Sequence, residues 1–154
     1  MLKLNFKSNN EEETKHFAKE LANKLKIGDI IVLSGELGSG KTKFTEGILE
    51  FFNLQDEISS PTFTIVNEYT SYSSIPIYHF DVYRLEDEDE FSAIGGEEYF
   101  EKGICIIEWG EMIENLLPPE YIKISFSKDE DDENVRLLNI ETFGNKFDNY
   151  FKNL

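Results

Sequence analysis

The amino-acid sequence predicts an α/β fold, a three-layer sandwich in which a mixed central sheet lies between two layers of helices. Two uninterrupted apolar runs, 29–34 and 104–108, are typical of strands covered on both faces. Segments with helical spacing of apolar residues alternate with such runs, as in layered α/β domains. Near the end, segments 121–127 and 135–143 predict a C-terminal antiparallel hairpin. With 154 residues and no repeat or linker, we expect one domain, 1–154.

The first two predicted elements are a strand and a helix. Residues 2–6 alternate between apolar and polar and favour a short strand. Asn9 or Asn10 is a suitable N-cap for a helix that runs to Lys26, and glutamates in its first turn suit the helix dipole. Gly28 ends the pattern.

The central elements follow the first apolar run and a glycine-rich turn. Residues 42–52 predict a helix, and 63–70 and 75–80 predict two strands. The acidic stretch 86–90 is expected to open a short helix, because carboxylates are favourable at a helix N-terminus. After Asn145, three aromatic residues recur at helical spacing: Phe147, Tyr150 and Phe151.

The charge of the chain is strongly acidic. Fifteen Lys and Arg against 31 Asp and Glu give a net charge of −16, and the isoelectric point is near 4.4. Such a surface repels phosphate backbones, which argues against unaided binding to nucleic acid or an anionic membrane. The single cysteine, Cys105, lies in an apolar run, forms no intrachain disulfide and fits a reducing compartment. The N-terminus has no signal-peptide pattern and no apolar run approaches about 20 residues, so we expect a soluble cytoplasmic protein.

The segment 35–42, GELGSGKT, matches the pattern G-x-x-x-x-G-K-[ST] in full. Gly38 and Gly40 permit backbone conformations in which successive N–H groups converge on a polyphosphate. Lys41 would reach the terminal phosphates, and the Thr42 hydroxyl would ligate Mg²⁺. The alternative, a glycine turn with an incidental lysine, is disfavoured by the position between a buried strand and a helix. The sequence therefore predicts a P-loop NTPase-like domain. Its candidate phosphate-binding residues are Leu37, Gly38, Ser39, Gly40, Lys41 and Thr42.

A P-loop also needs an acid that holds Mg²⁺, and two residues qualify. Asp81 and Glu108 each follow a predicted buried strand. Glu108 ends the more apolar run and is the better metal ligand, which leaves Asp81 to orient the attacking water or to support the metal shell. The alternative for either is a solvated carboxylate at a strand end.

Four further features have simpler interpretations. Thr62 could sense the terminal phosphate, although an ordinary proline turn is the favoured interpretation. Trp109, the only tryptophan, is expected to pack in the core or at its edge, and His79 to pack or form a hydrogen bond. Residues 145–148 match the guanine-reading pattern N-K-x-D, but no D-x-x-G segment accompanies it, so adenine is preferred.

Four motifs in order, GELGSGKT, SPTFTIVNEY, YHFDVYRL and CIIEW, make the chain resemble the TsaE (YjeE) family. These are bacterial P-loop ATPases required for threonylcarbamoyladenosine modification of tRNA. The resemblance implies ATP and Mg²⁺ as cofactors, and a role beside TsaD and TsaB in which the ATPase resets the machine between turnovers. It also implies a monomer or weak oligomer that meets tRNA only through the complex.

The resemblance further implies roles for individual residues. Lys41 and Thr42 would hold phosphate and Mg²⁺, and Glu108 would be the acidic metal ligand. Asp81 would be needed for hydrolysis. The other implied positions are a switch region at Thr62, a place beside the site for Trp109, and proximity to the nucleotide base for Glu11 and Thr14. Lys43 departs from the family pattern, where threonine is usual, and could alter partner contacts.

Two other functions share the predicted loop. A small-molecule kinase generally clamps phosphates with several arginines, whereas this chain has only Arg84 and Arg136. A non-hydrolysing nucleotide-sensing partner would bind ATP without turnover. Partner-dependent phosphate release, transfer to a metabolite and binding alone distinguish the three.

Overall fold

The structure of the chain, a computed structural model, describes residues 1–36, 38–54, 66–70, 75–83 and 85–152. These residues form an α/β domain around a seven-stranded mixed sheet, which confirms the predicted fold class. The elements in chain order are β1 (Lys3–Ser8), α1 (Glu11–Ala22), β2 (Ile30–Gly35), α2 (Lys41–Phe51), β3 (Val66–Thr70), β4 (Pro76–Asp81), α3 (Glu88–Ala93), η2 (Gly96–Tyr99), β5 (Ile104–Glu108), η3 (Gly110–Leu116), β6 (Tyr121–Lys128) and β7 (Arg136–Phe143).

The sheet has a parallel centre and antiparallel edges. Its strand order is β1-β7-β6-β2-β5-β4-β3, in which β6, β2, β5 and β4 run parallel. The hairpin β6–β7 and strand β1 extend one side, and β3 pairs antiparallel with β4 on the other. The carboxyl ends of β2, β4 and β5 therefore meet at one edge of the sheet, the usual place for a ligand in such a fold.

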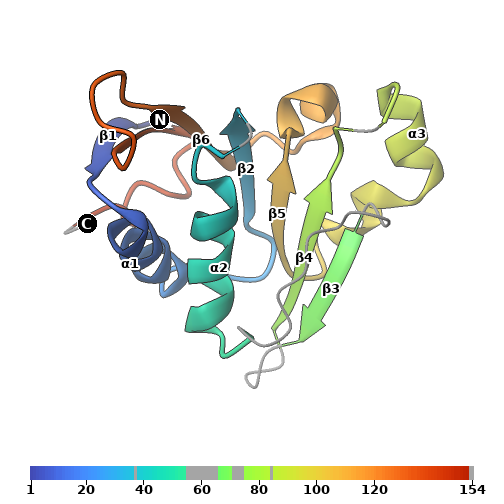
Figure 1. Cartoon of the computed structure of the whole chain (residues 1–154). Coiled ribbons are helices and arrows are strands. Elements are labelled where there is room, and N and C mark those ends of the chain that lie inside the picture. Colours follow the sequence, from blue (N-terminus) through green and yellow to red (C-terminus); the bar gives the residue numbers. More distant parts are fainter. Residues whose placement is uncertain (37, 55–65, 71–74, 84, 153–154) are drawn as a thin grey trace.

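Helices cover both faces of the sheet. In Figure 1, α1 and α2 lie together on one face and α3 lies on the other. The alternation within β2 explains the two cores: Ile31 and Leu33 belong to the core under α1 and α2, whereas Ile30 and Val32 belong to the opposite core. A strand that is apolar at every position is thus buried on both sides, as predicted.

Several sequence-based boundaries are confirmed. Asn10 is the N-cap of α1, and its side chain accepts a hydrogen bond from the Glu13 backbone N at 2.9 Å. Strand β5 has the predicted bounds, and β6 and β7 form the predicted hairpin. The expected strand residues 63–65 lie outside the described part of the chain.

Two parts of the chain differ from the sequence-based expectation by more than one or two residues. Helix α1 ends at Ala22 rather than Lys26, although Leu25 still packs in the core. Although the aromatic residues after Asn145 have helical spacing, the described residues 146–152 form turns, and the three aromatic residues are nevertheless buried against the α1–α2 core. None of the helices formed by the described residues is long and apolar enough to cross a lipid bilayer.

Candidate functional site

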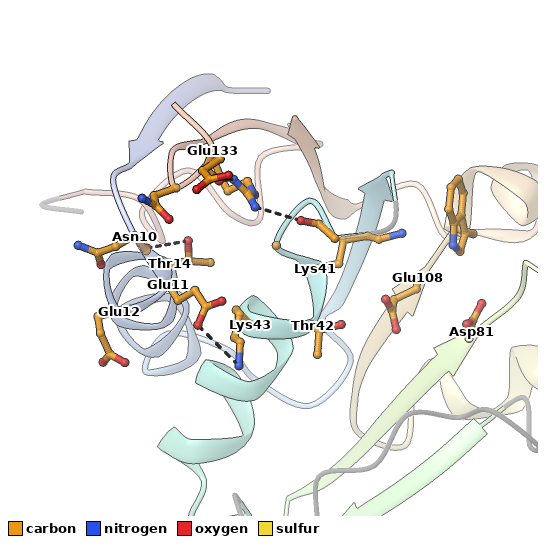
Figure 2. A pocket seen from close by; sticks show the side chains of 15 residues that line it. Asn10, Glu11, Glu12, Thr14, Lys41, Thr42, Lys43, Asp81, Glu108 and Glu133 are labelled. Carbon is orange, nitrogen blue, oxygen red and sulfur yellow. Dashed lines mark hydrogen bonds and ion pairs between the residues drawn. The ribbon is translucent and has the colours of Figure 1, made fainter. Parts of the chain in front are cut away.

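A cavity of about 570 Å³ lies at the sheet edge where β2, β4 and β5 end. Its volume is within the range of about 300–1,000 Å³ usual for small-molecule and cofactor sites. Three walls enclose it: the turn before α2 and the start of that helix, the carboxyl ends of β4 and β5, and the start of α1 with the β6–β7 loop (Figure 2). The lining residues are Gly38, Gly40, Lys41, Thr42, Lys43, Asp81, Glu108, Trp109, Asn10, Glu11, Glu12, Thr14, Glu133, Asn134 and Arg136.

The first wall presents backbone N–H groups. Gly38 and Gly40 have φ angles of 79° and 116°, in the left-handed region that glycine tolerates without strain. Gly40 occupies the N-cap position of α2, and no side chain of the described residues caps this helix. The first-turn N–H groups of α2 therefore lack a side-chain partner there and, with the positive end of the helix dipole, favour an anion.

The Lys41 ammonium lies inside this cavity without a direct anionic partner in the described structure. Its Nζ is 3.9 Å from the centre of the Trp109 ring. Desolvation by burial lowers the pKa of Lys41 below its ordinary value, although the nearby carboxylates of Glu108, Asp81 and Glu111 oppose this shift. A polyanion bound in the cavity would offset the cost of keeping this lysine charged.

The second wall carries the two acidic candidates. Asp81 and Glu108 are paired positions on the parallel strands β4 and β5, so their side chains lie at the same level of the sheet. The Glu108 Oε2 atom lies 2.7 Å from His79 Nε2, and an Asp81 carboxylate oxygen accepts a hydrogen bond from the Tyr83 backbone N at 3.1 Å. Figure 2 shows both carboxylates on one side of Lys41 and Thr42.

The donor set at this wall suits magnesium held jointly with a phosphate ligand. The described residues contain no group of three or more His, Cys, Asp or Glu side chains that could hold a metal by themselves. The oxygens of Thr42, Glu108 and Asp81 are hard donors, and Mg²⁺ is usually held by one or two carboxylates, water and substrate phosphates. The residues present therefore fit Mg²⁺.

The third wall comes from distant parts of the chain. Lys43 Nζ on α2 lies 3.8 Å from Glu11 Oε2, a contact that links α2 to the start of α1. The same Nζ lies 3.2 Å from Glu46 Oε2 on its own helix. Arg136 Nη2 donates to the Gly38 carbonyl at 3.3 Å, and its Nη1 donates to the Val135 carbonyl at 3.0 Å. Arg136 thus links the start of β7 to the glycine-rich turn before α2.

Sequence reasoning located much of this site but missed the β6–β7 loop. Glu133 and Asn134 of this loop line the cavity together with Arg136, the first residue of β7, although the hairpin was expected only to complete the sheet. The available signal was the scarcity of arginine, because Arg136 is one of two arginines in an acidic chain.

The remaining predicted site residues have varied positions. Trp109 and Glu11 line the cavity, whereas Ser39 is buried and is not a lining residue. Leu37 and Thr62 lie outside the described part of the chain.

Three features interpreted as structural are also accounted for. His79 forms the expected hydrogen bond, to Glu108. Cys105 is buried, and burial raises the pKa of its thiol to about 12, which fits an unreactive core residue. The residues of the N-K-x-D match do not line the cavity. Instead, Lys146 Nζ pairs with Asp29 Oδ1 at 2.8 Å.

Comparisons with known proteins agree with one another. The model of the family described as "Threonylcarbamoyl adenosine biosynthesis protein TsaE" matches residues 8–137. A Bacillus subtilis protein named tRNA threonylcarbamoyladenosine biosynthesis protein TsaE is 42% identical over 149 residues, which cover 96% of this chain and 91% of that protein. A Rickettsia felis protein of the same name is 44% identical over 135 residues, or 87% of this chain and 77% of that protein.

A solved structure resembles the whole fold. The crystal structure of Bacillus subtilis YdiB matches with a TM-score of 0.77 and 35% identity, covering 98% of this chain and 93% of the other. The match therefore spans nearly the whole of this chain.

Proposed function

The chain belongs to the TsaE family of threonylcarbamoyl adenosine biosynthesis proteins, and from this premise we propose that it is a cytoplasmic P-loop ATPase that serves threonylcarbamoyladenosine modification of tRNA. In this proposal it binds and hydrolyses ATP with Mg²⁺ as an accessory subunit beside TsaD and TsaB. It does not itself transfer the threonylcarbamoyl group, and it meets tRNA only through the complex. Alone it is a monomer or weak oligomer.

The observation that carries the proposal is the convergence of three features on one cavity. The uncapped start of α2, the buried Lys41 ammonium and the carboxylates at the ends of β4 and β5 all line it. Backbone N–H groups of the turn and Lys41 would bind the phosphates, and the start of α1 with Glu11 would face the base.

The acidic wall supplies the remaining roles. Thr42 and Glu108 would hold Mg²⁺, which when bound neutralises charge on the phosphate oxygens. Asp81 would orient the attacking water, because it lies at the same level of the sheet as Glu108 but on the neighbouring strand. Thr62 would belong to a segment that responds to the terminal phosphate.

The same cavity also allows two other functions, a small-molecule kinase and a non-hydrolysing nucleotide sensor, and one experiment distinguishes all three. For a kinase, the described structure offers Arg136, but both of its terminal nitrogens already donate to backbone carbonyls. This arrangement favours a scaffold role for Arg136 over a clamp on a second substrate.

The decisive experiment measures phosphate release from ATP by the purified chain, with and without TsaD and TsaB from the same organism. We expect slow release by the chain alone and clear stimulation by the partners. Phosphate transfer to a metabolite would favour a kinase. ATP binding without turnover under every condition would favour a nucleotide sensor.

A lysine substitution tests the site itself. Lys41→Ala removes a charge-assisted hydrogen bond worth about 1.5–3 kcal/mol, so ATP binding should weaken by about 10- to 100-fold. The matched control is Lys102→Ala, which removes the same charge from a lysine that lies over Tyr99 outside the cavity. Equal affinities for wild type and Lys41→Ala, measured by calorimetry, would refute the phosphate site.

A further inference from the structure

His79 is a polar side chain in a row of apolar ones. Successive strand residues point to opposite faces, so His79 on β4 shares a face with Ile77, which packs in the core under α1 and α2. Its paired position on the neighbouring strand β5 is Ile106, also in that core. The ring is buried, and an aliphatic residue would occupy this position without any loss of hydration. A histidine here therefore needs a reason other than packing.

The structure offers one polar contact for this ring. Its Nε2 lies 2.7 Å from Glu108 Oε2, across two adjacent strands. Its Nδ1 is buried and has no hydrogen-bond partner among the described residues. An ionised carboxylate can only accept hydrogen bonds, so Nε2 carries the hydrogen and donates it to Glu108. Within the described structure, the only hydrogen bond of the His79 ring is therefore to one oxygen of Glu108.

We propose that His79 is a positioning residue for Glu108. Its hydrogen bond holds Oε2 and leaves Oε1 as the oxygen available to the Mg²⁺ ion that Glu108 would ligate. A carboxylate without such a partner can rotate, and it then spends part of the time in orientations that cannot bind the ion. Hydrogen-bond partners of metal ligands typically change metal affinity by about 10- to 100-fold when removed. The inference rests on the proposed function, because it requires Glu108 to be a metal ligand.

Two nearly isosteric substitutions test this role. His79→Gln places an amide donor near the former Nε2 position, whereas His79→Met has similar length and no donor. A fluorescent ATP analogue is titrated against each variant in EDTA, and binding is then followed as Mg²⁺ is added. We expect similar affinities in EDTA. The Mg²⁺ midpoint of His79→Met should rise by about 10- to 100-fold, and that of His79→Gln should stay within about threefold of wild type.

Several outcomes would count against the role. A Mg²⁺ midpoint for His79→Met equal to that of wild type would overturn it. Equal losses of affinity for the analogue by the Gln and Met variants in EDTA would also overturn it, because they indicate a packing role. If wild type binds the analogue without any effect of Mg²⁺, the proposed function fails together with the inference. A Mg²⁺-dependent wild type with unaffected variants refutes the inference alone. Should His79→Met fail to fold by circular dichroism, His79→Asn, whose amide is too short to reach Oε2, is expected to give the same shift.

Discussion

At the scale of single residues, the proposed phosphate ligand would compete with Trp109 for the Lys41 side chain. In the structure its ammonium lies 3.9 Å from the centre of the Trp109 ring. A cation–π contact contributes about 0.5–2 kcal/mol, whereas a charge-assisted hydrogen bond to phosphate contributes about 1.5–3 kcal/mol. The phosphate should therefore displace the indole. Trp109 is also the only tryptophan, so any change in its surroundings is visible without interference.

This competition predicts a change in tryptophan fluorescence when ATP binds. Addition of MgATP should shift the intensity of Trp109, because the ammonium leaves the ring. In Lys41→Met, which keeps the length of the side chain but not its charge, the starting spectrum should already differ and the response should largely disappear. A full response in Lys41→Met, at ATP concentrations that saturate this variant, would contradict the displacement.

The two acidic residues of the cavity should contribute unequally to metal binding. Glu108 is held by His79 at 2.7 Å, whereas Asp81 accepts a hydrogen bond from the exposed loop residue Tyr83. Since loss of a ligand's hydrogen-bond partner alone costs about 10- to 100-fold in metal affinity, Glu108→Gln should weaken Mg²⁺-dependent ATP binding by at least about tenfold. Asp81→Asn should impair hydrolysis more than binding. Calorimetry in Mg²⁺ and in EDTA measures binding, and phosphate release from ATP measures hydrolysis. The reverse order would assign the metal to Asp81.

At the scale of elements, an ion-pair network joins the two helices that flank the site. Lys15 and Lys19 on α1 lie 3.0 and 3.1 Å from Glu50 on α2. The hydrogen bond from Lys15 is the largest cause that lowers the pKa of Glu50 below its ordinary 4.5, followed by that from Lys19. A lowered folded-state pKa stabilises the folded chain above pH 4.5, and this contribution is lost as the pH falls through the folded-state value.

The network predicts an acid-sensitive part of the stability. At pH 7, Glu50→Gln should lower the free energy of unfolding by about 1 kcal/mol, the upper end for partly exposed pairs. Below the folded-state pKa, the difference from wild type should vanish, because Glu50 is then protonated. Urea unfolding across this range measures the effect. Glu130→Gln, at an exposed position of the β6–β7 loop, is the control and should change little at either pH.

Periodicity predicted the elements better than the contacts between them. The apolar runs and the glycine turn located β2, β5 and the start of α2, because burial and backbone conformation leave a local pattern in the sequence. The Arg136 contact to Gly38 and the His79 contact to Glu108 join residues far apart in the chain. Such contacts depend on strand order and register, which local patterns do not specify.

The C-terminal tail shows a different limit. Its three aromatic residues have helical spacing and are buried, yet the segment forms turns. Tyr150 donates a hydrogen bond to Asp29 at 2.8 Å, and Lys146 pairs with the same carboxylate. These tertiary contacts hold the aromatic residues in place without a helix, and nothing in the spacing alone distinguishes the two conformations.

At the scale of the whole molecule, charge sets what the chain can bind without help. The net charge is −16, and four of the described lysines are paired with carboxylates. Lys15, Lys19, Lys43 and Lys146 all have acidic partners within 4 Å. The cationic residues that line the cavity, Lys41, Lys43 and Arg136, lie within a site sized for a small molecule.

We therefore expect the isolated chain not to bind tRNA at physiological salt. Proteins with non-specific affinity for nucleic acid owe it to released counterions, with dissociation constants of about 10⁻⁴–10⁻⁶ M. This acidic chain repels the phosphate backbone and releases few counterions, so its dissociation constant for tRNA should exceed about 10⁻⁴ M. Electrophoretic mobility shift at 150 mM salt, with and without MgATP, measures this. At this salt concentration, interactions between charges more than roughly 8 Å apart are largely screened. The same preparation must bind ATP, which excludes an unfolded sample. A shift by the chain alone that weakens steeply with salt would reveal a basic surface and contradict a purely partner-mediated route to tRNA.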